Sequence, residues 1–208
     1  NSQFVGKRIA KYYHKEATVI HPPVNVDQFY IAKPEDRKPY FLMVGRLIAY
    51  KRFDIAIEAF NALKLPLKII GRGPEMDRLK KLAGPTIEFL GRVSDEALPR
   101  YYAECRAFVF PQEEDFGIVA MEAMASGRPV IAYRGGDIVE HMKEGETGVF
   151  FNEQMTASIV GAVQGFDESR YDPVFIRNQA LHFDKEQFKT KIRNYVEDAL
   201  REHLKSQL

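Results

Sequence analysis

The sequence predicts an α/β domain in which helices cover both faces of a parallel sheet. Short apolar runs alternate along the chain with segments whose apolar residues recur at helical spacing. The apolar runs are continuous, which is typical of strands that are buried on both faces. Strands that alternate with helices form βαβ units and hence a parallel, Rossmann-like sheet.

The predicted strands are apolar runs that end at turn residues. Residues 40–44 end at Gly45, and residues 67–70 end at Gly71 in the same way. The first apolar run, at 18–20, stops just before a proline pair. In chain order the expected strands are 18–20, 40–44, 67–70, 87–90, 107–110, 130–132 and 148–151.

The predicted helices fill most of the intervals between these strands and the C-terminal part of the chain. Phe53, Ile57 and Phe60 recur at the spacing of one helix face. Ser94 can cap the helix that follows it. The expected helices are 53–64, 76–83, 95–104, 117–126, 137–143, 154–166, 174–182 and 185–206.

Composition and charge exclude several classes of function. The 208 residues include 30 Lys and Arg against 29 Asp and Glu, so the net charge of +1 creates no basic field for nucleic acid. The sequence has no run of 18 apolar residues, so we expect no transmembrane helix. It also has no signal-peptide pattern. Cys105 lies in an apolar stretch and is interpreted as a buried, inert thiol. The five histidines lack metal-ligand spacing, so no metal is expected.

Two glutamates mark the most informative stretch of the chain. Glu114 and Glu122 are separated by seven residues, the first on a strand-to-helix loop and the second within the helix. If most of this span is helical, the acids lie roughly 12 Å apart along the axis, about the reach of a nucleotide-sugar. Free N–H groups at the helix start favour a phosphate between them. The alternative is that paired acids near a helix start only complement the helix dipole.

Ligands of open parallel sheets bind beyond the carboxyl ends of the strands, which directs attention to the loops after the apolar runs. After strand 40–44, Arg46 offers a planar fork and Lys51 a mobile point charge, which together could neutralise a departing diphosphate. The alternative is a solvated basic loop.

The loop after strand 67–70 holds a second glycine-rich pattern. Gly71 and Gly73 let a nucleotide or the backbone approach closely. Position 76 is Met where a dinucleotide fingerprint requires a third glycine, so a redox cofactor is not expected.

Residues 111–132 resemble the signature of the retaining glycosyltransferases of family 4, whose two Rossmann-like domains form the GT-B fold. The motif has two glutamates seven residues apart, then a helix and a small-Gly-x-Pro-Val strand entry, and Glu114 and Glu122 fit it. Residues 1–5 and 19–29 look like the passage by which such enzymes leave their first domain. The resemblance covers almost the whole chain, but this chain corresponds only to the C-terminal, donor-binding half of a complete family member.

The resemblance implies how the chain is divided. Residues 1–30 are expected to be a lead-in or hinge from a missing N-terminal domain. Residues 31–208 are expected to be the donor nucleotide-sugar-binding domain, including C-terminal helices that cross toward the first domain, so the last helix should pack poorly here. We expect this isolated chain to bind its donor weakly and to transfer nothing measurable.

The resemblance also assigns roles to individual residues. Arg46 and Lys51 contact the distal phosphate and Glu114 faces the sugar hydroxyls, which makes these three the expected catalytic residues. Glu122 accepts from the ribose hydroxyls, and the base lies against the backbone near Arg92, for which a solvent-exposed side chain is the alternative. The expected donor-binding residues are Gly45, Gly71, Gly73, Arg92, Val93, Phe116, Gly117, Ile118, Val119 and Glu122.

The expected function is donor binding in a retaining glycosyltransferase that moves a hexosyl group, with mannose favoured, to a glycan or lipid-linked acceptor. GDP-mannose is favoured over a UDP-sugar because the Glu-Asp-Phe-Gly segment at 114–117 looks most like members that use it. A nucleotide-sugar epimerase and a non-catalytic nucleotide-sugar-binding module remain alternatives. The resemblance implies a cytoplasmic location, with peripheral contact of the whole protein at the inner face of the cytoplasmic membrane.

Overall fold

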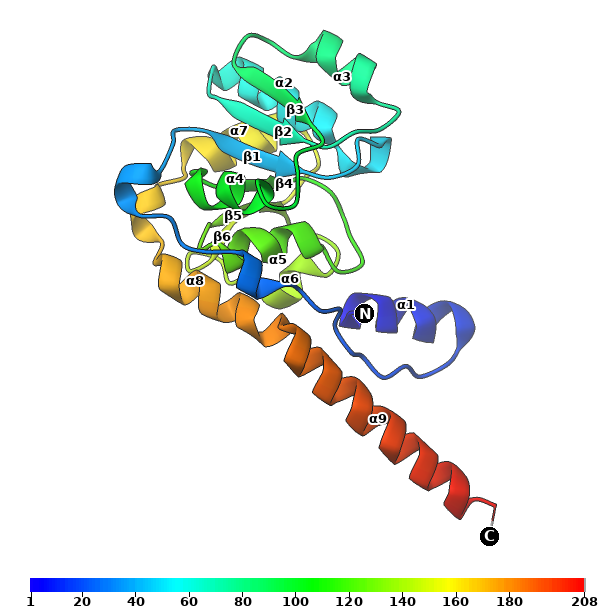
Figure 1. The fold of residues 1–208 in the computed structure, drawn as a ribbon. Helices are drawn as coiled ribbons and strands as arrows, with labels where there is room; N and C mark the ends of the chain where they lie inside the picture. Colours follow the sequence, from blue (N-terminus) through cyan, green and yellow to red (C-terminus); the bar gives the residue numbers. More distant parts are fainter. Residues whose placement is uncertain (208) are drawn as a thin grey trace.

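A computed structural model describes residues 1–207 and has the predicted architecture (Figure 1). Six parallel strands form one sheet in the order β3-β2-β1-β4-β5-β6. They are β1 (Phe41–Val44), β2 (Leu67–Ile70), β3 (Ile87–Gly91), β4 (Phe108–Phe110), β5 (Val130–Tyr133) and β6 (Gly148–Phe151). Every strand expected between residues 40 and 151 is confirmed, with its ends displaced by at most one residue.

Helices cover both faces of this sheet. One face packs against α2 (Phe53–Leu63), α3 (Met76–Leu82) and α7 (Thr156–Gln164). The other face packs against α4 (Leu98–Glu104), α5 (Ile118–Ala125), α6 (Ile138–His141) and α8 (Pro173–Ala180). Successive residues of β1 contribute to opposite cores, because side chains alternate along a strand: Phe41 and Met43 join the first core and Leu42 joins the second.

Four helices, α4 to α7, begin one to three residues later than the sequence predicts, and two of these starts have a local cause. The helix expected from residue 95 starts at Leu98, because residues 95–97 form a turn in which the Ala97 N–H donates to Ser94 Oγ at 3.3 Å. α5 starts at Ile118 because Gly117 has a φ of +67°, outside the right-handed helical region.

Residues 1–30, expected to be a lead-in segment, contain a capped helix that contacts α6. They contain α1 (Gln3–Tyr13), which Ser2 caps by accepting from the Val5 N–H at 3.1 Å. The Glu140 carboxylate of α6 accepts from the N–H groups of Gln3 and Phe4 at 3.0 and 2.6 Å. The strand expected at 18–20 is wrong, because that segment has no neighbouring strand to pair with.

The last helix, α9 (Lys185–Lys205), projects away from the sheet and its covering helices (Figure 1). It has no buried residue, as expected for a terminal helix that packs poorly. Its exposed apolar side chains are Ile192, Tyr195, Val196, Leu200 and Leu204. None of the helices within residues 1–207 has the length and apolar character needed to cross a membrane.

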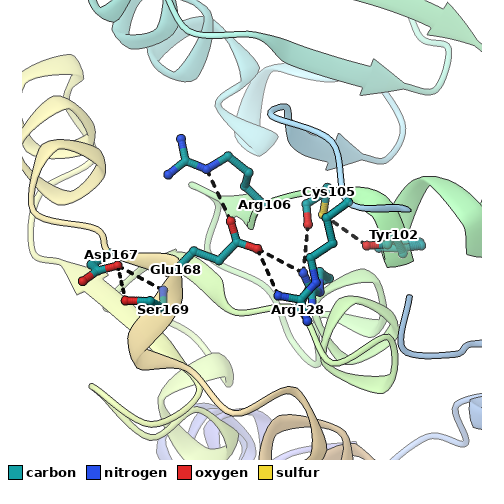
Figure 2. Close-up of polar contacts among 8 residues, drawn as sticks. Tyr102, Cys105, Arg106, Arg128, Asp167, Glu168 and Ser169 are labelled. Atoms are coloured by element: carbon teal, nitrogen blue, oxygen red, sulfur yellow. Dashed lines mark hydrogen bonds and ion pairs between the residues drawn. The ribbon is translucent and has the colours of Figure 1, made fainter. Parts of the chain in front are cut away.

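Three arginines converge on Glu168 at the amino edge of the sheet, and Figure 2 labels two of them, Arg106 and Arg128, with their contacts to this carboxylate. Arg37, Arg106 and Arg128 precede β1, β4 and β5, and their nitrogens lie 3.6, 3.5 and 3.3 Å from the Glu168 oxygens. The Arg128 side chain is 1% exposed and also donates to the Cys105 carbonyl. Burial, followed by repulsion from Arg37, lowers the pKa of Arg128. Glu168 therefore compensates buried positive charge and ties the segment after α7 to the sheet.

Replacing Glu168 with Ala should strongly destabilise the fold, because it leaves the buried Arg128 guanidinium without its compensating carboxylate. We expect the free energy of unfolding to fall by about 3 kcal/mol in urea denaturation. The control is Glu197→Ala, which removes an exposed partner of Arg201 on α9 and should cost less than about 0.5 kcal/mol. Similar losses in the two variants would contradict the anchoring role of Glu168.

Candidate functional site

The strand order reverses between β1 and β4. The chain moves outward from β1 through β2 to β3, and then returns to place β4 on the other side of β1. The loops after two such strands diverge and open a crevice at the carboxyl edge of the sheet. In this chain they are residues 45–52 and 111–117, two of the loops that the sequence analysis selects.

An ion pair joins these two loops across the crevice. Lys51 Nζ lies 2.8 Å from Glu114 Oε1, and the two side chains are only 15% and 17% exposed. The Tyr50 hydroxyl, 3.4 Å away, donates to the same carboxylate oxygen. Because the pair is largely shielded from water, its attraction is stronger than that of an exposed pair.

A cavity of about 290 Å³ borders the ion pair. Six of its lining residues are predicted site residues, and the other two come from the N-terminal segment. The lining residues are Lys51, Glu114, Phe116, Gly117, Ile118 and Val119, together with Asn1 and Pro22. The segment that the sequence predicts only as a lead-in therefore forms one wall of the candidate site.

The start of α5 faces this cavity and requires glycine at its cap. Gly117 has a φ of +67°, and a Cβ there would lie 2.9 Å from Cζ of Phe110. The N–H groups of Ile118 and Val119, in the first turn, have no partner within the helix. The cavity therefore offers backbone donors and the positive end of a helix dipole to an anion.

Glu122 lies one turn into α5 and is mostly buried. Its Oε2 accepts a hydrogen bond from the Tyr102 hydroxyl of α4 at 2.8 Å. Burial raises the pKa of the Glu122 carboxyl, Tyr102 opposes this shift, and the nearby Asp95 adds to it. Because α5 starts only at Ile118, helix accounts for about 6 Å of the path between Glu114 and Glu122, less than the expected 12 Å.

A second cavity, of about 220 Å³, is lined by the other predicted loops. It is lined by Gly45, Arg46, Gly71, Arg92 and Val93, with Val44, Ile70, Arg72, Asp95 and Leu98. Gly45 lines this second cavity, and a Cβ there would lie 3.6 Å from Nζ of Lys51, which lines the first. Arg46 and Lys51 thus approach one crevice from neighbouring cavities.

Gly71 and Gly73 hold the loops after β1 and β2 together. A Cβ on Gly71 would lie 1.8 Å from the carbonyl oxygen of Gly45, and one on Gly73 would lie 2.2 Å from that of Leu47. Gly73 lies outside both cavities, so the observed role of this glycine is close packing of the backbone.

Sequence reasoning missed several residues at this edge. Tyr50 adjoins Lys51 in the sequence, but Tyr102 is twenty residues from Glu122, and nothing in the pattern links them. Asp137 is fully buried, and a Cβ on Gly117 would lie 3.6 Å from its Oδ1. Its Oδ2 lies 3.4 Å from His141 Nε2, and burial raises the pKa of the Asp137 carboxyl. Within residues 1–207, no three His, Cys, Asp or Glu side chains are grouped as a metal site requires.

The fold defines the class of protein: this is a Rossmann-like half of the GT-B glycosyltransferase fold. Sucrose-phosphate synthase from Thermosynechococcus elongatus superposes with a TM-score of 0.86 over 97% of this chain and 57% of that chain, at 22% identity. The chain belongs to the family of glycosyl transferases group 1, whose model matches residues 27–180.

Two curated relatives illustrate the breadth of this family. The sulfoquinovosyl transferase SQD2 of Arabidopsis thaliana is 33% identical over 176 residues, 79% of this chain and 34% of the relative. A GDP-mannose-dependent alpha-(1-6)-phosphatidylinositol monomannoside mannosyltransferase of Mycolicibacterium smegmatis is 27% identical over 192 residues, 78% of this chain and 50% of the relative. The chain thus spans half or less of the length of these relatives.

Replacing Glu122 with Gln should stabilise the chain at neutral pH. Because burial raises the pKa of Glu122, the protonated form contributes stability that is lost as pH rises through the folded-state pKa. Gln keeps the shape and an acceptor for Tyr102. We expect a melting temperature about 2–4 °C above wild type at pH 7, with a smaller gain at pH 4.

The control for this prediction is the exposed neighbour Glu113, whose change to Gln should leave the melting temperature unchanged at both pH values. An equal gain for Glu122→Gln at pH 4 and pH 7 would show that ionisation of the buried carboxyl does not cause the effect.

Proposed function

We propose that this chain is the donor-binding domain of a retaining glycosyltransferase, which moves a hexosyl group from a nucleotide-diphosphate sugar to a glycan or lipid-linked acceptor. The observation that carries the proposal is the shielded Lys51–Glu114 pair at the start of α5, in the crevice where the strand order reverses. A cation, a carboxylate and free N–H groups at one point suit the junction of a sugar and a diphosphate.

The ion pair suggests how a donor would be received. In the structure, Lys51 neutralises Glu114. A diphosphate at the start of α5 would draw the Lys51 ammonium toward its oxygens, and Glu114 would then accept from the hydroxyls of the sugar. Arg46 would approach the same diphosphate from the second cavity, and Glu122 would accept from the ribose hydroxyls.

In the proposed reaction, the bond between sugar C1 and the diphosphate oxygen breaks with oxocarbenium character. The acceptor oxygen bonds to C1 on the same face, and its proton passes to the leaving phosphate. Negative charge grows on this phosphate in the transition state, where Arg46, Lys51 and the N–H groups at the start of α5 stabilise it by preorganised electrostatics. In this proposal these cations replace a metal ion, and no cofactor is used.

We favour GDP-mannose as the donor over a UDP-sugar. The relative from Mycolicibacterium smegmatis, whose name states GDP-mannose dependence and mannosyl transfer, supports this preference at 27% identity. The sulfoquinovosyl transferase relative keeps other donor sugars open. The acceptor would bind to a separate N-terminal domain of the whole protein. We place the whole protein in the cytoplasm, with peripheral contact to the cytoplasmic membrane.

The donor site can be tested by titrating this chain calorimetrically with GDP, UDP, ADP and their sugar conjugates in EDTA. We expect one nucleotide series to bind and GDP to bind best. The double variant Arg46→Ala/Lys51→Ala and the single variant Glu122→Ala should each bind at least about tenfold more weakly, because each loses charge-assisted hydrogen bonds.

The matched control for these titrations is Lys80→Ala/Lys81→Ala, which removes two exposed cations of α3 and should not change affinity. Failure of the folded wild-type chain to bind any of these nucleotides would contradict a donor site carried by this domain. Nucleotide binding without transfer by the full-length protein would instead favour a non-catalytic binding module.

The stereochemistry of transfer tests the reaction type. Full-length protein that carries this domain should give a product with the anomeric configuration of the donor, as read by ¹H NMR. A product of inverted configuration would exclude the retaining mechanism, while epimerisation of the donor sugar without transfer would favour the epimerase alternative.

A further inference from the structure

Tyr102 places a buried hydroxyl against the carboxylate proposed to bind ribose. Its side chain is fully buried, and its hydroxyl donates to Glu122 Oε2 at 2.8 Å, which links α4 to α5. The ring packs edge-on to Phe29 at 5.5 Å and obliquely to Phe108 at 5.6 Å between centroids. The hydroxyl is therefore held in place by aromatic packing that does not depend on Glu122.

The direction of this hydrogen bond is fixed by chemistry. Burial, followed by the charge of Glu122, raises the pKa of the Tyr102 phenol well above its usual value, so the phenol keeps its proton. An ionised carboxylate only accepts, so Tyr102 is the donor and occupies Oε2. Glu122 Oε1 has no hydrogen bond within residues 1–207 and is left for an outside donor.

We infer that Tyr102 is a positioning residue that holds Glu122 with Oε1 directed at the vicinal hydroxyls of a ribose, so that the site selects ribonucleotides over deoxyribonucleotides. This inference rests on the proposed function and adds a second residue to its ribose subsite. Tyr102 touches no substrate. It acts by fixing the rotamer of Glu122 and by stabilising the ionised form of that residue.

The surroundings of Glu122 show why its carboxylate needs a hydrogen-bond donor such as Tyr102. Burial of Glu122 favours its neutral form, and Asp95, which precedes α4, pushes its pKa further upward. The hydrogen bond from Tyr102 acts in the opposite direction, lowering this pKa and favouring the ionised carboxylate. A protonated Glu122 would lose the negative charge that strengthens its hydrogen bonds to hydroxyl groups.

The test replaces Tyr102 with Phe, which keeps the ring and removes the hydroxyl. We expect the affinity of the 208-residue chain for GDP at pH 7 to fall about tenfold, with UDP used if it binds better. The preference for GDP over 2′-deoxy-GDP should shrink by a similar factor. As pH is lowered, the affinity of the variant for GDP should begin to fall at a higher pH than that of wild type. The reason is that loss of the Tyr102 hydroxyl raises the pKa of Glu122 further. In the full-length protein, KM for the donor should rise and kcat should change little.

The matched control is Tyr40→Phe, which removes another buried hydroxyl, one that donates to the Tyr101 carbonyl at 2.9 Å. It should keep wild-type affinity, ribose preference and pH dependence. A double-mutant cycle completes the test: Tyr102→Phe should have no further effect on affinity in a Glu122→Gln background, because Tyr102 acts through the Glu122 carboxylate.

The outcomes separate this inference from the proposed function. If wild type binds none of the nucleotides, the proposed function fails. If wild type prefers ribose and Tyr102→Phe keeps that preference and the pH profile, only the role of Tyr102 is overturned. If Tyr102→Phe does not fold, ¹³C NMR of wild type decides, since the Glu122 carboxyl and Tyr102 Cζ signals should shift at the same pH. Shifts at different pH values would overturn the inference.

Discussion

The reversal of strand order between β1 and β4 is the constraint on which the candidate site depends. Parallel strands send all their carboxyl ends to one edge, but most adjacent loops there fold back over the same face of the sheet. Only where the order reverses do neighbouring loops diverge and leave a crevice. β1 and β4 are the two strands at that point, so Lys51 and Glu114 meet although 63 positions separate them in the sequence.

Two carboxyl groups are buried near the crevice, although burial of charge does not favour folding. Glu122 is buried with one hydrogen-bond donor, and Asp137 is buried beside the start of α5. Buried carboxylates destabilise a fold unless they are paired. Their presence together at one edge is typical of a site where ligand binding, and not stability, determines which residues are present.

The sequence was sufficient to predict the sheet, its covering helices and the loops at its carboxyl edge, because these follow from hydrophobic periodicity and from glycine and proline positions. Periodicity could not predict that residues 18–20 lack a strand partner, since pairing depends on the rest of the fold. It could not show that Asn1 and Pro22 line a cavity or that Tyr102 contacts Glu122. Such contacts depend on tertiary packing between distant segments. The roles of Arg46 and Glu114 in chemistry remain predictions.

The anchor around Glu168 lies at the amino edge of the sheet, opposite the crevice. The residues that fix the strand starts are therefore separate from those that face a ligand. In related proteins that share this fold, loops at the carboxyl edge can differ in length and charge while the arginines before the strands are retained. Substrate preference can thus change over evolution without a matching change in the free energy of unfolding.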